Sequence, residues 1–323
     1  MRARTILVRK VIGLVVTLLA VYTLNFFLFH MLPGDPAYAL VGPRMPADQV
    51  AVIHEMLGLD KPLYVQYFIS LKLLLVDGYL GESWVFDKEV LDIVLDKMQY
   101  TLLLVGVGTA LTVFVGVNLG IIAGSRRGRP VDVAVVGSSL AFYAMPAFWL
   151  AMIMIMGFSA SLHWFPLEGM ESDIGREKPL GERVPDILWH MVLPVTVFVL
   201  VSISEFVMMM RNALVDSLTE DYVTTARAKG LTPKDIVRKH AVPNALIPTV
   251  ATTAMFIGWV VTGTIMIEIV FNWPGIGTLT LSALNNQDYP LLQGLFLVVT
   301  LTMLLANFGA DIVYTYIDPR VRI

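Results

Sequence analysis

The sequence predicts an all-α integral membrane protein with six transmembrane helices, and three observations support this fold class. The chain of 323 residues is 56% hydrophobic. Only 15% of its residues are charged, whereas a soluble protein carries about 25%. Its mean hydropathy is +0.72. Six apolar stretches are long enough to cross a bilayer, which takes about 20 residues: Val11–Met31, Met98–Ser125, Val133–Leu167, Ile187–Met210, Ala245–Ile267 and Leu291–Tyr314.

The first apolar stretch, Val11–Met31, follows a basic N-terminal tail. A cleaved signal peptide is the alternative interpretation, and Ala37-Tyr38-Ala39 fits the small-residue cleavage pattern. The apolar core of a signal peptide is roughly 7–15 residues long, which is shorter than this stretch. We therefore interpret it as the first transmembrane helix.

Two local patterns inside the apolar stretches indicate how the helices are built. Gly116, Gly120 and Gly124 lie on one helical face, and small residues at this spacing let another helix approach closely. Pro146 lies inside a stretch too long for one helix. Because proline has no N–H to donate to the carbonyl of Phe142, a kink is expected there.

The distribution of Lys and Arg predicts the orientation of the chain. With six spans, 15 of the 23 Lys and Arg residues fall on the side that holds both termini. We expect that side to be cytoplasmic. The chain then divides into an N-terminal tail with the first helix, an extracytoplasmic segment, a five-helix core with a cytoplasmic loop, and a cytoplasmic tail: 1–31, 32–97, 98–316 with the loop 212–244, and 317–323.

The cytoplasmic loop 212–244 is polar and reads as two short helices. The first is expected from about Asp216 to Lys229, with acidic residues early and basic residues late, as the helix dipole favours. Gly230 suits the C′ position that ends a helix. Thr232 and Asp235 form a capping-box-like start for the second helix. Such a loop is expected to be a rigid surface knob that another protein can grip.

The loop resembles the EAA loop of ABC importer permeases, whose pattern is E-A-A-x3-G-x9-I-x-L-P. Placing Gly230 on the glycine of the pattern puts Thr224-Thr225-Ala226 on E-A-A and His240–Pro243 on I-x-L-P. Ala226, Gly230 and Pro243 match, whereas Thr224, Thr225 and His240 depart from the pattern. The runs TARAKGL and HAVPNALIP resemble the peptide/nickel branch of these permeases more closely.

A second motif, Glu268–Gly277, resembles the E-x-V-F-x-W-P-G-x-G sequence of the same branch. Pro274 and Gly275 suit the two central positions of a type II turn. Trp273 suits a membrane interface, and an ordinary interfacial turn is the alternative interpretation of this motif taken alone. The phrase LPGDPA and the run Asp288-Tyr289-Pro290 continue the resemblance in the same order along the chain.

The resemblance implies a type I ABC importer permease fold with a sizeable extracytoplasmic segment after the first helix. It implies residence in the cell membrane, a second homologous permease subunit, two cytosolic ABC ATPase subunits and an extracytoplasmic solute-binding protein. The solute expected is a peptide, with nickel or oligosaccharides as alternatives. The residues expected to contact the ATPase are Thr224, Thr225, Ala226, Arg227, Lys229, Gly230, His240 and Pro243.

Within that expectation, Ala226 and Gly230 permit close approach of the ATPase, and Arg227 and Lys229 pair with its acidic groups. The motif residues Glu268, Trp273, Pro274 and Gly275 are expected to form an external gate or turn.

Glu205 is a carboxylate inside an apolar stretch, where charge is costly and usually faces a cavity or a partner. With Met209 it is a candidate for the solute path, and pairing with a neighbouring helix is the alternative. An autonomous secondary transporter or channel using Glu205 is a second hypothesis. An intramembrane enzyme is a third, but the sequence contains no recognisable catalytic set, cofactor motif, metal cluster or nucleic-acid motif. With no cysteine in the chain, thiol chemistry is excluded.

Overall fold

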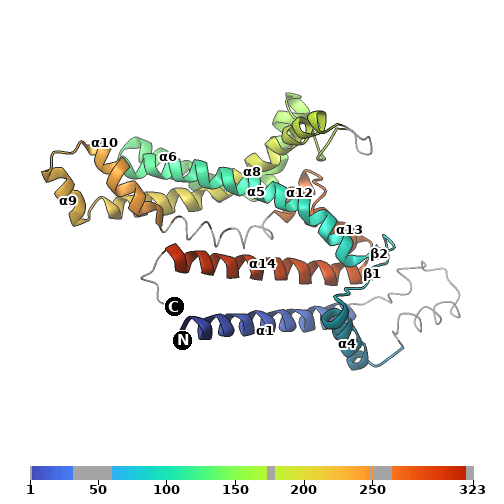
Figure 1. Cartoon of the computed structure of the whole chain (residues 1–323). Helices are drawn as coiled ribbons and strands as arrows, with labels where there is room; N and C mark the ends of the chain where they lie inside the picture. The colour runs from blue at the N-terminus through green and yellow to red at the C-terminus, as the bar shows by residue number, and fades with distance from the viewer. Residues whose placement is uncertain are drawn as a thin grey trace. The chain divides into compact units, whose positions relative to one another are not determined.

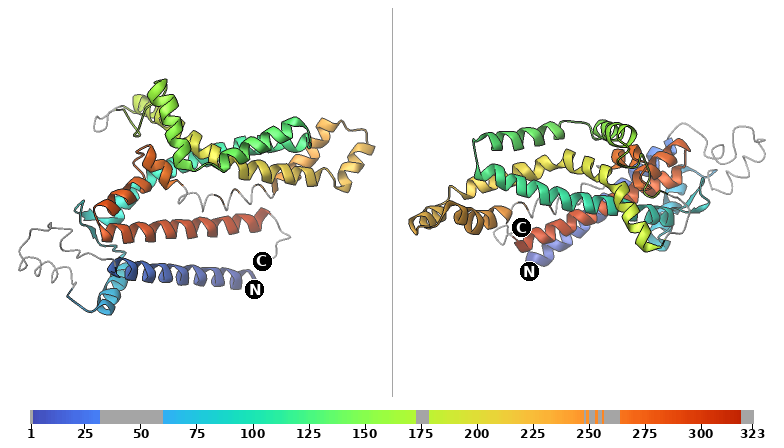
Figure 2. Two further views of the ribbon diagram at one scale, coloured as in Figure 1. Left: turned by 180° about the vertical axis from the view of Figure 1, so that it is seen from behind. Right: turned by 90° about the horizontal axis from the view of Figure 1, so that it is seen from above.

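The computed structural model describes residues 2–31, 60–172, 179–247, 249, 253, 256 and 264–317. The chain forms two compact units, which are described separately (Figures 1 and 2). The first unit comprises Met1–Tyr100 and Pro274–Leu304. The second comprises Thr101–Trp273 and Leu305–Ile323. Helix α5 passes from the first unit into the second.

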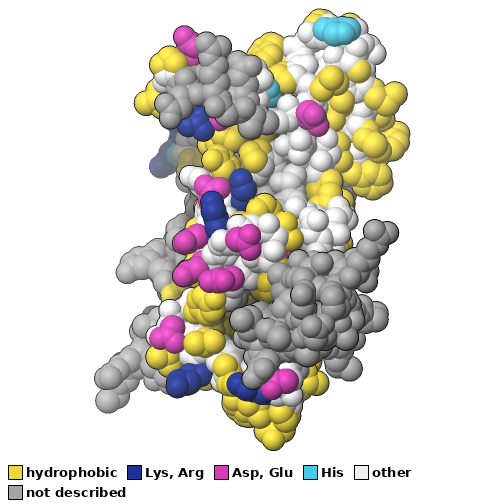
Figure 3. Space-filling model, turned by 90° about the vertical axis from the view of Figure 1, so that its right-hand side faces the viewer, with side chains coloured by type: hydrophobic (Ala, Val, Ile, Leu, Met, Phe, Trp, Pro, Cys, Tyr) yellow, Lys and Arg dark blue, Asp and Glu magenta, His cyan; other side chains and the backbone are white. Residues whose placement is uncertain are grey.

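The described residues contain four helices long and apolar enough to cross a membrane: Arg9–Phe29, Val90–Ser125, Leu180–Ser217 and Tyr289–Gly309. A bent pair of helices, Pro130–Tyr143 and Ala147–Ser161, makes a fifth span if the pair counts as one. Large apolar side chains such as Val16, Leu24 and Phe114 are exposed on these helices, as expected for contact with lipid. Hydrophobic side chains also form several patches on the face drawn in Figure 3. The sixth expected span, 245–267, lies mostly outside the described residues, as does 32–59 of the expected extracytoplasmic segment.

The described part of the first unit contains long helices and several shorter elements. Its elements are α1 (Arg2–Met31), α4 (Leu63–Lys72), the π-helical η1 (Leu73–Asp77), β1 (Glu82–Ser83), β2 (Lys88–Glu89), the start of α5 (Val90–Ser125), α13 (Ile276–Asn285) and the part of α14 (Tyr289–Ile317) up to Leu304. The strands β1 and β2 pair antiparallel. Helices α1 and α14 lie side by side, with the rings of Phe29 and Phe296 stacked 5.9 Å apart (Figures 1 and 2). The core includes Val90, Leu279 and Leu291.

The buried carboxylate of Asp288 organises one end of the first unit. It caps α14, because its Oδ1 accepts a hydrogen bond from the backbone N–H of Leu291 at 3.2 Å. The same carboxylate accepts from the Ser83 hydroxyl and from the backbone N–H of Val85 at 3.2 Å. Asp288 is fully buried. One side chain therefore fixes the β1–β2 hairpin against the start of the last long helix.

The second unit holds the remaining helices. They are the rest of α5, α6 (Pro130–Tyr143), α7 (Ala147–Met154), the π-helical η2 (Ile155–Ser161), α8 (Leu180–Ser217), α9 (Asp221–Ala228), α10 (Pro233–Ile236), the π-helical η3 (Val237–Ala241) and α12 (Ile265–Val270). A cluster of buried apolar residues that includes Leu150, Val197, Phe206 and Phe271 forms its core.

The glycines of α5 provide the close approach that their spacing predicts. A Cβ added at Gly116 would lie 2.7 Å from the Cβ of Phe206, and one at Gly120 would lie 2.7 Å from the Cβ of Met210. A Cβ at Gly124 would lie 3.0 Å from the carbonyl oxygen of Arg211. All three partners belong to α8, so α8 packs against the glycine face of α5 (Figure 2).

The predicted effect of Pro146 is confirmed in a stronger form, because the helix is broken rather than kinked. Helix α6 ends at Tyr143 and α7 begins at Ala147, with a bend of 99° between the two helices. Pro146 is the N-cap residue of α7, and its carbonyl accepts the N–H of Leu150 at 3.1 Å. A proline before the first helical residue costs no hydrogen bond there.

The expectation of a type II turn at Pro274-Gly275 is wrong. Gly275 has φ −97° instead of the positive φ that such a turn requires, and it is the N-cap of α13. The positive φ lies at Asn272, at 50°. The N–H of Trp273 donates to the carbonyl of Glu268 at 2.8 Å, which makes this a Schellman-type end of α12. Trp273 is fully buried, so it is not an exposed anchor at a membrane interface.

Candidate functional site

The loop 212–244, called the coupling loop below, begins inside a helix rather than at its start. Helix α8 continues to Ser217, a turn follows, and α9 begins at Asp221 (Figure 1). The expectation that the first loop helix starts near Asp216 is therefore wrong. Asp216 is polar but extends the transmembrane helix beyond its apolar part, which an apolar window does not detect.

Both predicted caps of the coupling loop are present. Gly230 has φ 78°, its N–H donates to the carbonyl of Arg227 at 2.9 Å, and the N–H of Leu231 donates to the carbonyl of Ala226 at 3.3 Å. This is a Schellman motif with glycine at C′. At the second helix, the hydroxyl oxygen of Thr232 accepts the N–H of Asp235 at 3.2 Å.

Ion pairing reinforces the second cap. The Asp235 carboxylate lies 2.8 Å from the Lys239 ammonium one turn later and accepts a hydrogen bond from the Thr232 hydroxyl at 2.6 Å. The bond with Lys239, followed by that with Thr232, holds the pKa of Asp235 below its usual range. The carboxylate therefore stays charged at neutral pH and keeps both partners.

The coupling loop has a small core of its own. Val223, Ala226 and Ile236 are buried against one another, with Leu218 packed beside them. Ala226 is only 5% exposed, so it joins α9 to α10 rather than lying on the loop surface. Of the residues expected to contact an ATPase, most are exposed and His240 is half-buried; the exposed ones are Thr224, Thr225, Arg227, Lys229, Gly230 and Pro243.

The coupling loop is also fixed to the end of α8. The Ser217 hydroxyl donates to the carbonyl of Ala241 at 3.0 Å and hydrogen-bonds the Tyr222 hydroxyl. Met210 and Leu214 of α8 pack against Ala241 in a buried cluster. The loop and the last two turns of α8 therefore form one packed body.

An open groove of about 960 Å³ runs along α8 beside the coupling loop. The two sequence-predicted path residues, Glu205 and Met209, both line it. The groove continues past Asn212 and Asp216 to the start of the loop. Glu205 is exposed in the groove. The structure thus places the two predicted path residues in the same groove as the first residues of the coupling loop.

The remaining predicted residues lie in α12 and the segment after it. Glu268 is fully buried, as is Trp273, and Gly275 is the N-cap residue of α13. Among the described residues that line the groove, none comes from α12.

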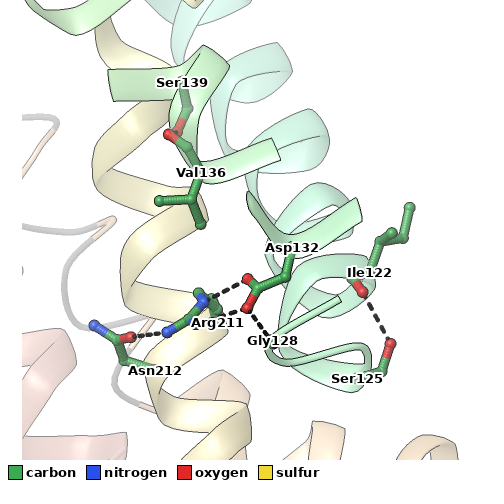
Figure 4. Close-up of polar contacts among 8 residues, drawn as sticks. All are labelled: Ile122, Ser125, Gly128, Asp132, Val136, Ser139, Arg211 and Asn212. Atoms are coloured by element: carbon green, nitrogen blue, oxygen red, sulfur yellow. Dashed lines mark hydrogen bonds and ion pairs between the residues drawn. The ribbon is translucent and has the colours of Figure 1, made fainter. Parts of the chain in front are cut away.

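One polar pair of the second unit escaped the sequence analysis. The Asp132 carboxylate of α6 accepts two hydrogen bonds from the Arg211 guanidinium of α8, 2.7 Å from Nε and 2.8 Å from Nη2 (Figure 4). Its Oδ2 also accepts the backbone N–H of Gly128 at 2.8 Å. Asp132 is only 3% exposed. The sequence signal for the pair is that each residue stands at the end of an apolar stretch.

Comparisons with known proteins define the class of this chain. Residues 116–323 match the family described as the binding-protein-dependent transport system inner membrane component. Residues 4–105 match the family that describes the N-terminal part of that membrane component. The chain therefore belongs to this family of multi-pass membrane permeases.

Individual relatives agree with the family. The chain is 36% identical over 324 residues to the di/tripeptide transport system permease protein DppB of Pseudomonas aeruginosa, with 96% of each chain covered. It is 34% identical over 316 residues to the glutathione transport system permease protein GsiC of Escherichia coli K12, with 98% of each covered. A solved structure of the MetNI methionine ABC transporter, in an inward-facing conformation, matches with a TM-score of 0.55 and 18% identity. That match covers 71% of this chain and 97% of the other, and it shows the ABC importer permease fold.

Proposed function

We propose that this permease subunit imports peptides and that ATP hydrolysis in separate cytosolic subunits drives it through the coupling loop. The observation that carries the proposal is the construction of that loop. Two capped helices share a core and are fixed to the end of α8 by Ser217 and by the Met210–Leu214 cluster. A packed body transmits a displacement to the helix it is fixed to, whereas a flexible loop would absorb it.

The exposed side of the loop offers the contact surface. Thr224, Thr225, Arg227 and Lys229 are exposed around the buried Val223–Ala226 face of α9. The two basic side chains are positioned to pair with acidic groups of an ATPase. Gly230 serves the backbone turn, since a Cβ there would meet nothing within 4 Å and the constraint is its φ of 78°.

The groove beside Glu205 and Met209 is proposed as this subunit's half of the solute path. It opens on the same helix that carries the coupling loop, so a movement of the loop changes the helix that lines the path. A second homologous permease subunit supplies the other half, and an external solute-binding protein delivers the solute. The buried residues Glu268 and Trp273, with Pro274 and Gly275 after them, are proposed to form part of an external gate.

Crosslinking tests the coupling assignment. Because this chain has no native cysteine, each introduced cysteine is its single thiol. Thr225→Cys and Lys229→Cys are introduced singly into the intact importer, with the buried Ala226→Cys as the matched control. We expect a thiol crosslinker to join the two exposed positions, but not position 226, to the ATPase subunit. The assignment fails if an importer that still transports gives no ATPase adduct at either exposed position.

The topology is part of the proposal and has its own test. Both termini, the turn around Gly128 and the coupling loop are placed in the cytoplasm, and segment 32–97 outside. A membrane-impermeant thiol reagent added to intact cells should label Asp77→Cys and leave Thr225→Cys unlabelled. The reverse pattern would refute the orientation and the coupling role together.

The solute assignment rests on the relatives, whose names refer to di/tripeptide and glutathione transport. Uptake of a labelled dipeptide by the reconstituted importer, with nickel and an oligosaccharide as competitors, tests it. If labelled nickel or labelled oligosaccharide is taken up and the dipeptide is not, peptides are not the solute.

A second candidate function is supported by the exposure of Glu205 in the groove, which would suit a proton or cation site in an autonomous transporter. The ATP dependence of uptake distinguishes an ATP-driven importer from an autonomous transporter. We expect uptake to require the ATPase subunits, and Glu205→Gln to leave that requirement unchanged. Uptake driven by a proton gradient without ATP, and lost in Glu205→Gln, would favour the second function.

A further inference from the structure

The Asp132–Arg211 pair joins three parts of the second unit through one buried carboxylate. Asp132 stands in the first turn of α6, Gly128 belongs to the turn between α5 and α6, and Arg211 belongs to α8. Both carboxylate oxygens accept hydrogen bonds from the guanidinium, and the fork fixes orientation as well as distance. Figure 4 shows the guanidinium of Arg211 directed at Asp132.

The pair lies close along α8 to the residue that attaches the coupling loop. Arg211 lies six residues before Ser217, the residue that fixes the coupling loop to α8, so about 9 Å of helix separates the two attachment points. That helical segment is packed by Met210 and Leu214 into the same cluster as the loop. A displacement of the loop therefore reaches Arg211 without passing a flexible joint.

On the other side of the pair, α6 leads into the break at Pro146 and then into α7. The two helices meet at 99°, so a shift of α6 along its length changes where α7 begins. Among the described residues, the other side-chain hydrogen bonds from α6 stay within α6: the hydroxyls of Ser138 and Ser139 donate to the carbonyls of Val135 and Val136. Among the described contacts, Asp132 is the polar attachment of α6 to α8.

We propose that the Asp132–Arg211 pair is the positioning link that makes α6 follow the coupling loop, so that movement imposed by the ATPase reaches the broken span of α6 and α7. The proposal rests on the proposed coupling function of the loop. Neither residue touches solute or ATP in this scheme. The link acts by holding α6 in register with α8 during transport.

The test uses the complete reconstituted importer with Arg211→Lys, which keeps the charge but removes the fork, and with Asp132→Asn. The matched control is Glu171→Gln, because Glu171 pairs with Arg183 of the same helix α8 at 2.8 Å but far from the loop in sequence. We expect both variants to retain co-purifying ATPase and basal ATP hydrolysis while the transport rate falls about 5- to 150-fold, the range of typical coupling between sites. KM for solute should stay unchanged, and the control should transport like the wild type.

Rescue separates a link from a general structural role. In Asp132→Cys/Arg211→Cys, a short bifunctional thiol reagent should restore transport, and cleaving the reagent should remove it again. The proposal is overturned if Asp132→Asn and Arg211→Lys transport normally, if they lose the ATPase together with transport, or if the crosslinked pair is no better than the uncrosslinked one. Failure of loop–ATPase crosslinking in the wild-type importer would instead refute the proposed function itself.

Discussion

The contact between α5 and α8 yields the sharpest stability prediction. In Gly120→Ala the new methyl group would lie 2.7 Å from the Cβ of Met210, 2.8 Å from the carbonyl oxygen of Val207 and 3.2 Å from the backbone nitrogen of Arg211. Two of these atoms are backbone and cannot rotate away. The helices must therefore separate by about 0.7 Å to restore a normal contact, and overpacking of this kind costs about 1–3 kcal/mol.

Two glycines of the same helix act as internal standards. Gly106→Ala should leave stability unchanged or raise it by about 0.5–1 kcal/mol, because a Cβ there meets nothing within 4 Å and alanine favours the helix. The stability of Gly124→Ala should lie between those of the other two variants, because the nearest atom to its added Cβ is at 3.0 Å.

Thermal unfolding of the purified protein in detergent measures the relative stability of the three variants. One kcal/mol corresponds to roughly 2–4 °C in Tm for a unit of this size, so Gly120→Ala should lose about 2–12 °C. The reasoning is refuted if the three variants have the same Tm, or if Gly106→Ala is the least stable.

Three further predictions concern the caps and junctions. Ser83→Ala should lower the free energy of unfolding by about 1–3 kcal/mol, because the buried Asp288 carboxylate loses a donor, and thermal unfolding beside the exposed control Ser138→Ala measures this. Gly230→Asn should preserve transport better than Gly230→Val, because asparagine tolerates a positive φ and a β-branched residue does not; equal loss in both would mean that the bulk of the side chain matters instead. Lys239→Gln should raise the pKa of Asp235 toward the ordinary aspartate value, because the carboxylate loses its ion pair. The charged carboxylate supports the Thr232 cap above the unfolded pKa, and this support is lost as pH falls through the folded pKa, so it should be lost at a higher pH in the variant. The carboxyl carbon shift of Asp235 monitors this, and an unchanged titration would contradict it.

Local patterns in the sequence predicted local structure well. The glycine spacing of α5 marked the face that packs on α8, Pro146 marked a break, and Gly230 and Thr232 marked two helix caps. Each of these effects depends on backbone geometry within one or two turns. The same holds for Glu205 and Met209, the two residues proposed to line the path, which lie one turn apart and share a groove.

Contacts between distant residues were not predictable in this way. Asp132 and Arg211 are 79 residues apart, and Ser83 and Asp288 are 205 apart. No periodicity or spacing connects such partners: Asp132, Arg211 and Asp288 each look like an ordinary polar residue near the end of an apolar stretch, and Ser83 is one polar residue of a polar segment. The sequence places the positive φ after α12 at Gly275, because Pro274-Gly275 has strong turn chemistry; the helix ends earlier, at Val270, and the positive φ lies at Asn272.

The junction at Asp288 has a consequence for biosynthesis. A chain leaves the ribosome N-terminus first. The hairpin that presents Ser83 and Val85 is then made long before the carboxylate that satisfies it, and the last long helix is needed to complete the shared core. Until residue 288 emerges, these donors must hydrogen-bond to water or to a chaperone. A nascent chain truncated before that residue should remain sensitive to protease at the hairpin, and the full-length chain should not.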